Sequence, residues 1–151
     1  ELPSNFTLDV VGSFVSGEYK NRIDIILSLY NLKERVRFHG LVFNVETYYK
    51  NCFLVVVPSI VDDAQPLVIL ESMARQKLVI ASNVGGIATI LTGTLSTLIF
   101  EPTAQQLSAK INQIYNLSLE DKHNLKVCLY DRFIKQYEIT NTHRQLEKYL
   151  L

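Results

Sequence analysis

The sequence predicts an α/β fold, a Rossmann-like three-layer domain with a parallel sheet of about five to six strands and helices at its C-terminal end. The first observation is alternation, because β-rich runs and helical segments follow one another five times along the chain. The second is the apolar run FLVVV at residues 53–57, which is typical of a strand buried on both faces of a parallel sheet. Such alternation implies right-handed βαβ crossovers with helices on both sides of the sheet.

The expected elements follow the chain in order. Strands are predicted at residues 6–11, 35–38, 53–57, 78–81 and 97–100, and helices at 19–30, 46–51, 66–76, 87–91 and 104–117. Two of these helices carry apolar residues at helical spacing: Ile23, Ile26, Leu27 and Tyr30 in the first, and Leu107, Ile111 and Ile114 in the last. Residues 118–151 are predicted to be helical throughout, with a capping box at Ser118 and Asp121 and a last helix capped by Thr140. Since neither a repeat nor a linker interrupts the chain, we expect one domain over residues 1–151.

Composition excludes several classes of protein. The chain has 15 basic and 15 acidic residues, whereas domains that bind nucleic acid usually show a basic surplus, so we expect no nucleic-acid partner.

Cys52 and Cys128 have no metal-ligand spacing and are expected to be reduced thiols. The three histidines, His39, His123 and His143, also lack such spacing, and we expect no metal site. His39 is interpreted as a structural histidine with a hydrogen-bond partner. No signal peptide or apolar run of membrane-spanning length occurs, which favours a cytoplasmic protein.

The segment from the strand at 53–57 into the helix at 66–76 places polar groups outside the carboxyl end of a strand, where parallel sheets bind ligands. Pro66 suits the first helical position, and the amides of Leu67 and Val68 are then available to an anion. Glu71 lies about 7.5 Å along the helix axis, and its side chain leans back toward the helix N-terminus. A carboxylate there accepts hydrogen bonds from a vicinal diol such as that of ribose, and Asp63 adds a second carboxylate on the loop. This combination suits a nucleoside diphosphate joined to a sugar.

The alternative is that Glu71 is an exposed helix residue and Asp63 a turn former. A second candidate, Gly85–Gly86 after the strand at 78–81, lets the backbone approach a ligand closely, although a plain turn explains the pair equally well. The dinucleotide fingerprint Gly-x-Gly-x-x-Gly is absent after Gly12, and so are the P-loop and the Gly-x-Ser-x-Gly elbow. These absences argue against nicotinamide or flavin Rossmann domains, P-loop nucleotidases and serine hydrolases.

Six stretches in this order resemble glycosyltransferase family 4, a retaining family of the GT-B fold. They are LDVVG (8–12), ERVRFHG (34–40), YKNCFLVVVPS (49–59), PLVILESMA (66–74), VIASNVGG (79–86) and LIFEP (98–102). The resemblance covers nearly the whole chain. It implies that the chain is the C-terminal, donor-binding half of a GT-B fold, beginning after the first βα unit of that half.

The resemblance assigns the donor site residue by residue. Asp63 and Glu71 occupy the ends of the family's acidic motif and take the catalytic roles, with Asp63 contacting the donor sugar and Glu71 the ribose hydroxyls. The residues implied in donor binding are Gly12, Gly40, Leu41, Ser59, Gln65, Pro66, Leu67, Val68, Glu71, Gly85 and Gly86. The chain departs from the family pattern in three ways: Asp63 replaces a glutamate, Ala64-Gln65-Pro66 replaces Gly-Phe-Gly, and Thr89 replaces a glutamate after the two glycines.

The implied function is sugar transfer from a nucleoside diphosphate donor, a hexosyltransferase reaction with retention of configuration, without a metal or other cofactor. The implied partners are the nucleotide sugar, an N-terminal acceptor-binding domain of the same parent chain, and a glycan or lipid-linked acceptor. We expect a cytoplasmic protein, with peripheral membrane association at the inner face through the missing half. The fragment alone, without the Arg and Lys of the first βα unit, is expected to be inactive. Two alternatives stay open, a non-catalytic nucleotide-sugar-binding module and a GT-B sugar-nucleotide epimerase.

Overall fold

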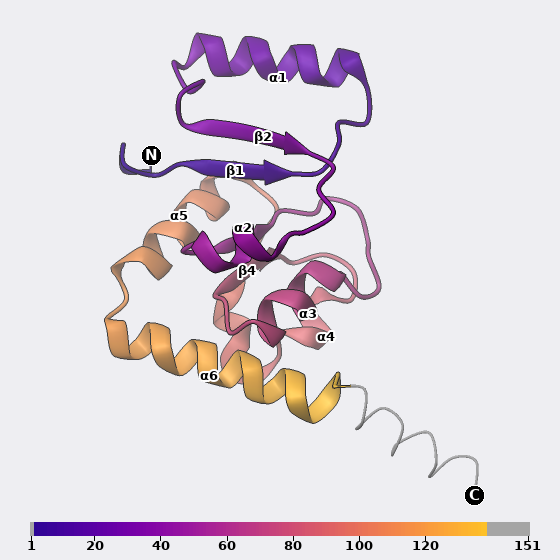
Figure 1. The fold of residues 1–151 in the computed structure, drawn as a ribbon. Coiled ribbons are helices and arrows are strands. Elements are labelled where there is room, and N and C mark those ends of the chain that lie inside the picture. The colour runs from indigo at the N-terminus through magenta and orange to yellow at the C-terminus, as the bar shows by residue number, and fades with distance from the viewer. Residues whose placement is uncertain (1, 139–151) are drawn as a thin grey trace, which may run out of the picture. The chain divides into compact units, whose positions relative to one another are not determined.

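Strands and helices alternate along the chain in the computed structural model, which describes residues 2–138 (Figure 1). The alternation and the parallel pairing confirm the predicted α/β class. Within these residues, two strands pair in the first part of the chain and three in the second, all in parallel as alternation implies. Thr140, His143 and the predicted last helix lie outside the described residues.

The chain divides into two compact units, Glu1–Asn51 and Cys52–Leu151, and each is described by itself. In the first unit, β1 (Leu8–Val11) pairs in parallel with β2 (Val36–Gly40), and α1 (Gly17–Leu29) connects them. A short helix, α2 (Glu46–Asn51), follows with the predicted bounds. The first strand begins two residues later than predicted because the chain first makes a turn, in which the Phe6 amide donates to the Pro3 carbonyl at 3.2 Å.

Only part of the predicted stripe on α1 is buried. Leu27 is buried and Ile23 is half-buried, whereas Ile26 and Tyr30 are 47% and 66% exposed. The Ser16 hydroxyl caps the helix by accepting from the Tyr19 amide at 3.2 Å.

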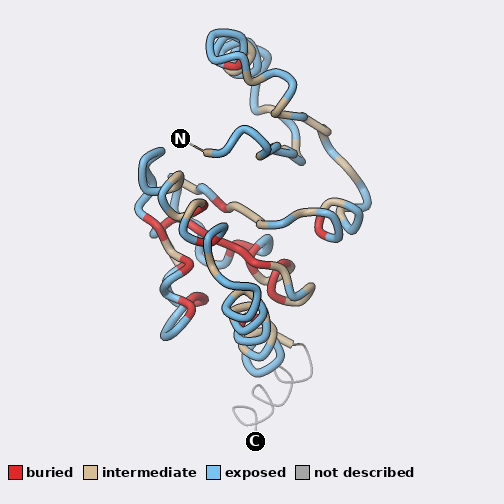
Figure 2. Tube along the Cα trace, turned by 90° about the vertical axis from the view of Figure 1, so that its left-hand side faces the viewer, coloured by how far each residue is buried: buried red, intermediate tan, exposed pale blue. Residues whose placement is uncertain are grey.

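The second unit contains β3 (Val55–Val57), β4 (Val79–Ser82) and β5 (Ile99–Phe100) in the spatial order β3-β4-β5. The helices are α3 (Leu67–Ala74), α4 (Ile87–Ile90), α5 (Ala104–Asn116) and α6 (Leu119–Gln136). Helix α3 packs against α6, and α5 packs on β4 and β5. Figure 2 shows the buried residues gathered mainly in this unit. The predicted cap of α6 is confirmed, since the Asp121 amide donates to the Ser118 hydroxyl at 3.0 Å.

Two predictions about these strands were wrong. The run at 53–57 is not buried on both faces: Val57 is buried, but Val55 and Val56 are half-buried and Phe53 is 43% exposed. Strand β3 lies at the edge of its sheet, and the strand buried throughout is the central β4. The strand predicted at 97–100 begins at Ile99, because a 3₁₀ helix, η1 (Gly93–Leu98), occupies the preceding residues. The Ser96 and Thr97 hydroxyls donate to the carbonyls three residues earlier, which supports this tighter turn.

Candidate functional site

The loop between β3 and α3 forms an open depression at the carboxyl end of β3. Its volume is about 590 Å³, and its lining is Pro58, Ser59, Ile60, Val61, Asp62, Asp63 and Ala64. Two predicted site residues, Ser59 and Asp63, therefore line one cavity. The lining combines exposed carboxylates with the exposed apolar side chains of Ile60 and Val61. Such a mixture suits a ligand with both hydroxyl groups and apolar C–H faces.

The carboxylate of Asp63 is oriented by its own loop. Its Oδ1 accepts a hydrogen bond from the Gln65 amide at 2.9 Å, which is the side-chain-to-backbone pattern of a turn-forming aspartate. The turn-forming interpretation of Asp63 is thus confirmed. That role leaves the second carboxylate oxygen on an exposed side chain, so it does not conflict with ligand binding.

Helix α3 begins one residue later than predicted. Pro66 is the N-cap, with φ −61° and ψ 109°, so it is not the first helical residue. An extended ψ leaves its carbonyl able to accept from the Ile69 amide at 3.0 Å, and that hydrogen bond starts the helix. Within the described residues, the amides of Leu67 and Val68 donate to no protein acceptor. They are the donors that a helix N-terminus offers to an anion.

Glu71 lies in the middle of α3 with a side chain that is 42% exposed. Its Oε2 is 3.9 Å from Nη1 of Arg75, one helical turn toward the C-terminus, and the same Nη1 donates to the Glu71 carbonyl at 3.1 Å. The sequence argument emphasised the backward lean of Glu71 and missed Arg75, although a Glu–Arg spacing of four on one helix predicts this pair.

The two glycines between β4 and α4 lie against the same loop. The Gly86 amide donates to the Asp63 carbonyl at 2.9 Å. A Cβ at Gly86 would lie 1.8 Å from the Ala64 carbonyl oxygen, and one at Gly85 would lie 2.6 Å from that of Asp63. Glycine is therefore required at these two positions by the close approach of the loop at residues 58–64. Contact of these glycines with a donor stays a prediction.

Ser82 was missed by the sequence argument. Its side chain is fully buried, and its hydroxyl lies 2.6 Å from the Ser59 carbonyl and 3.4 Å from that of Val57. A hydroxyl residue at the end of an otherwise apolar buried strand is the available signal, because a buried hydroxyl needs a hydrogen-bond partner.

In the first unit, the structure brings Gly12 and Gly40 together. The Gly12 amide donates to the Gly40 carbonyl at 2.8 Å, and Leu41 follows with a 75% exposed side chain. Gly12, Gly40 and Leu41 thus lie together in the first unit, and in the second unit Gly85 and Gly86 lie against the loop that carries Ser59 and Asp63.

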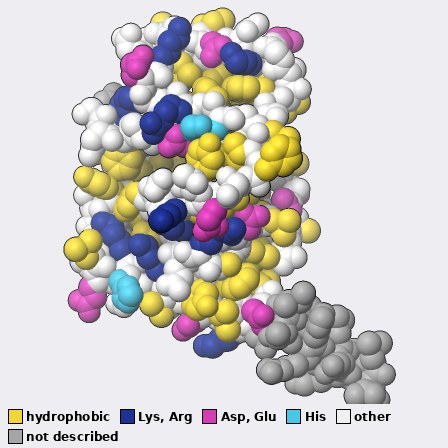
Figure 3. All heavy atoms as spheres, in the orientation of Figure 1, with side chains coloured by type: hydrophobic (Ala, Val, Ile, Leu, Met, Phe, Trp, Pro, Cys, Tyr) yellow, Lys and Arg dark blue, Asp and Glu magenta, His cyan; other side chains and the backbone are white. Residues whose placement is uncertain are grey.

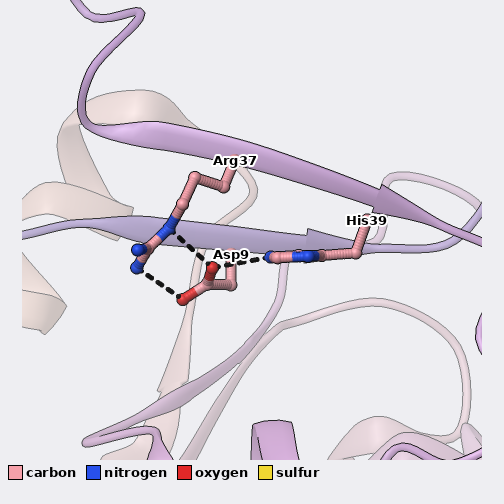
Figure 4. A network of polar contacts seen from close by, with 3 residues as sticks. All are labelled: Asp9, Arg37 and His39. Atoms are coloured by element: carbon pink, nitrogen blue, oxygen red, sulfur yellow. Dashed lines mark hydrogen bonds and ion pairs between the residues drawn. The ribbon is translucent and has the colours of Figure 1, made fainter.

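A polar network joins β1 and β2 in the first unit (Figure 4). Asp9 Oδ1 lies 2.7 Å from His39 Nε2 and 3.0 Å from Arg37 Nε. The hydrogen bond from His39, with those from Arg37, lowers the pKa of the Asp9 carboxyl below its ordinary value. The His39 ring also contacts Tyr48 edge-on, with centroids 4.7 Å apart. The prediction that His39 is a partnered structural histidine is confirmed.

Residues 2–138 contain no cluster of three His, Cys, Asp or Glu side chains that could hold a metal ion. Within the same residues, no helix has the length and apolar character needed to cross a membrane. On the face drawn in Figure 3, acidic and basic side chains are interspersed.

The family model described as "Glycosyl transferases group 1" matches residues 1–127. No curated protein matches the chain in sequence. Among solved structures, HepE of Anabaena in complex with UDP-glucose is 20% identical with a TM-score of 0.87, covering 98% of this chain and 41% of HepE. A glycosyltransferase from Rickettsia africae is 19% identical with a TM-score of 0.81, covering 97% of this chain and 48% of that protein.

A shorter structure gives a nearly full-length match. The C-terminal domain of a glycosyl transferase group 1 family protein, LpcC from Francisella tularensis, is 16% identical with a TM-score of 0.74. The match covers 91% of this chain and 89% of that domain. The chain thus spans less than half of the Anabaena and Rickettsia proteins, and likenesses at these identities show a shared GT-B domain fold.

Proposed function

Because the chain belongs to the family of group 1 glycosyl transferases, we propose that it is the donor-binding domain of a retaining hexosyltransferase of glycosyltransferase family 4. The full-length protein would transfer a sugar from a nucleoside diphosphate donor to a glycan or lipid-linked acceptor. The acceptor-binding domain would lie in the remainder of the protein, at the cytoplasmic side of a membrane. The Anabaena structures with UDP-glucose and with UDP support a nucleotide sugar as the ligand class.

The single observation that carries the site assignment is the arrangement around the start of α3. The amides of Leu67 and Val68 are available donors at the positive end of a helix, which suits the diphosphate. Glu71 lies on the same helix with a partly exposed carboxylate, which suits the ribose diol. Asp63 lies on the loop before the helix with its carboxylate oriented by Gln65, which suits the donor sugar.

Each group has a separate part in the proposed mechanism. The α3 amides and helix dipole stabilise the negative charge that grows on the departing diphosphate, and such fixed donors act without reorganisation during the reaction. Glu71 and Asp63 hold the ribose and the sugar, so that the anomeric carbon faces the acceptor hydroxyl. No metal or other cofactor enters this proposal.

The test is sugar transfer by the full-length protein and its Glu71→Gln and Asp63→Asn variants. Each variant loses a charged acceptor of hydrogen bonds, which costs about 1.5–3 kcal/mol, or about 10- to 150-fold in kcat/KM. Glu120→Gln is the matched control, because Glu120 is an exposed carboxylate in the first turn of α6. Undiminished transfer by Glu71→Gln would remove Glu71 from its role.

One observation favours a second candidate, a nucleotide-sugar-binding module without catalysis. The Thr89 hydroxyl donates to the Gly86 carbonyl at 2.6 Å, so this position offers a hydroxyl engaged with the backbone in place of the family's carboxylate. Donor binding without turnover by the full-length protein would favour this candidate. Turnover of the donor without any acceptor would instead indicate an epimerase.

A further inference from the structure

The acidic loop at residues 58–64 is attached to the end of β4 and the turn that follows, at two points. At its start, the buried Ser82 hydroxyl is hydrogen-bonded to the Ser59 carbonyl at 2.6 Å. At its end, the Gly86 amide donates to the Asp63 carbonyl at 2.9 Å. Between these points the side chains of Ile60 and Val61 are 80% and 73% exposed. The attachments therefore fix the ends of the loop and leave its middle to solvent.

The second attachment determines where Asp63 lies. Its backbone oxygen accepts from the Gly86 amide and its side-chain Oδ1 accepts from the Gln65 amide, so both the backbone and the side chain of Asp63 are hydrogen-bonded. Gly86 has φ −76° and ψ −1°, a conformation that any residue adopts. Glycine is required there by contact alone, since a Cβ would lie 1.8 Å from the Ala64 oxygen. A Cβ added at Gly85, whose φ is +53°, would lie 2.6 Å from the Asp63 carbonyl oxygen.

We propose that Gly85 and Gly86 are positioning residues that set the location of the Asp63 carboxylate by direct backbone contact with its loop. The inference rests on the proposed function, in which Asp63 contacts the donor sugar. It gives the Gly-Gly turn a part in transfer that does not depend on contact between the glycines and the donor.

The test is Gly86→Ala in the full-length protein. Ordinary contact begins at 3.4 Å and the added Cβ would lie at 1.8 Å, so the loop and the turn must separate by about the difference, 1.6 Å. A displacement of about 1 Å from productive geometry lowers the rate about 100-fold, so we expect that loss in kcat. Gly17→Ala is the matched control, because Gly17 also begins a helix without a positive φ and has nothing within 4 Å of its Cβ. It should keep kcat within about twofold.

A second pair of variants distinguishes the effect of contact with the loop from the effect of backbone strain. Gly85 and Gly93 have similar positive φ values, +53° and +63°, but only Gly85 faces the loop, at 2.6 Å. Both alanine variants impose a strained left-handed conformation on a residue with a Cβ, but only Gly85→Ala also adds an atom against the loop. The loss of kcat in Gly85→Ala should therefore exceed that in Gly93→Ala. Equal losses would contradict the proposal.

A double-mutant cycle with Asp63→Ala gives a readout that a general loss of stability would not change. If the glycines act through Asp63, Gly86→Ala should reduce kcat little further once Asp63 is alanine. Additive losses would overturn the proposal.

Crystal structures of Gly86→Ala and Gly17→Ala distinguish failure of this inference from failure of the proposed function. If the wild-type protein transfers no sugar, the proposed function fails, yet a shift of Asp63 in Gly86→Ala that is absent from Gly17→Ala would still support positioning. An unmoved Asp63 in that variant, or wild-type kcat, would overturn the inference.

Discussion

Ile80 lies at the centre of the second unit, and its replacement by alanine tests the account of the core. The residue is fully buried in β4, the middle strand of a three-stranded sheet. Ile80→Ala removes three carbons, and each buried carbon contributes about 0.8 kcal/mol, so the transfer loss is about 2.4 kcal/mol. The cavity that remains raises the loss toward about 4 kcal/mol. Ile80→Val, with one carbon removed, should cost about 1 kcal/mol.

The assay is urea unfolding followed by far-UV circular dichroism and by amide exchange of α6, which reports on the second unit. With a slope of about 1.5 kcal/mol per molar urea, Ile80→Ala lowers the midpoint by about 1.6 to 2.7 M. The control is Ile25→Ala, because Ile25 lies on α1 and is 66% exposed. A loss below about 1 kcal/mol for Ile80→Ala, or one equal to that of Ile25→Ala, would refute the burial of β4.

Two further predictions concern titration and thiol chemistry. Since the folded pKa of Asp9 lies below its unfolded value, its ionised form stabilises the fold above the unfolded pKa, and this stabilisation disappears as the pH falls through the folded pKa. The difference in unfolding midpoint between wild type and Asp9→Asn should therefore be present at about pH 7 and decrease as the pH falls below the ordinary carboxyl value of about 4, and a difference independent of pH would contradict the network. Burial raises the pKa of the Cys52 thiol, whereas Cys128 is exposed, so iodoacetamide should alkylate Cys128 first. Mass spectrometry of timed samples checks this order, and faster labelling of Cys52 would contradict it.

Local patterns predicted the elements well where one segment determines its own structure. The bounds of α2 match, and Ile111 and Ile114 on α5 are buried as their spacing predicts. The 3₁₀ helix before β5 was missed because it depends on hydroxyl-to-carbonyl bonds of Ser96 and Thr97, which apolar periodicity does not report.

In the candidate site, too, the local sequence predicted the features of single segments but not the contacts between distant ones. The carboxylates at Asp63 and Glu71 and the amides at the start of α3 follow from one continuous stretch of sequence. The contacts that hold the loop join residues about twenty positions apart, Ser82 with Ser59 and Gly86 with Asp63. No local pattern encodes which carbonyl a distant hydroxyl or amide meets, so the sequence indicated a turn at Gly85–Gly86 without its partner.

The central claim is that the start of α3 binds the nucleoside diphosphate of a sugar donor. Isothermal titration of UDP, GDP and ADP into the full-length protein tests it most directly, with Glu71→Ala and the control Glu120→Ala titrated alongside. The account predicts that one nucleotide binds, that Glu71→Ala weakens this binding at least about tenfold, and that Glu120→Ala leaves it unchanged. Binding by Glu71→Ala at wild-type affinity, or no binding of any of the three nucleotides to the wild type, would contradict it.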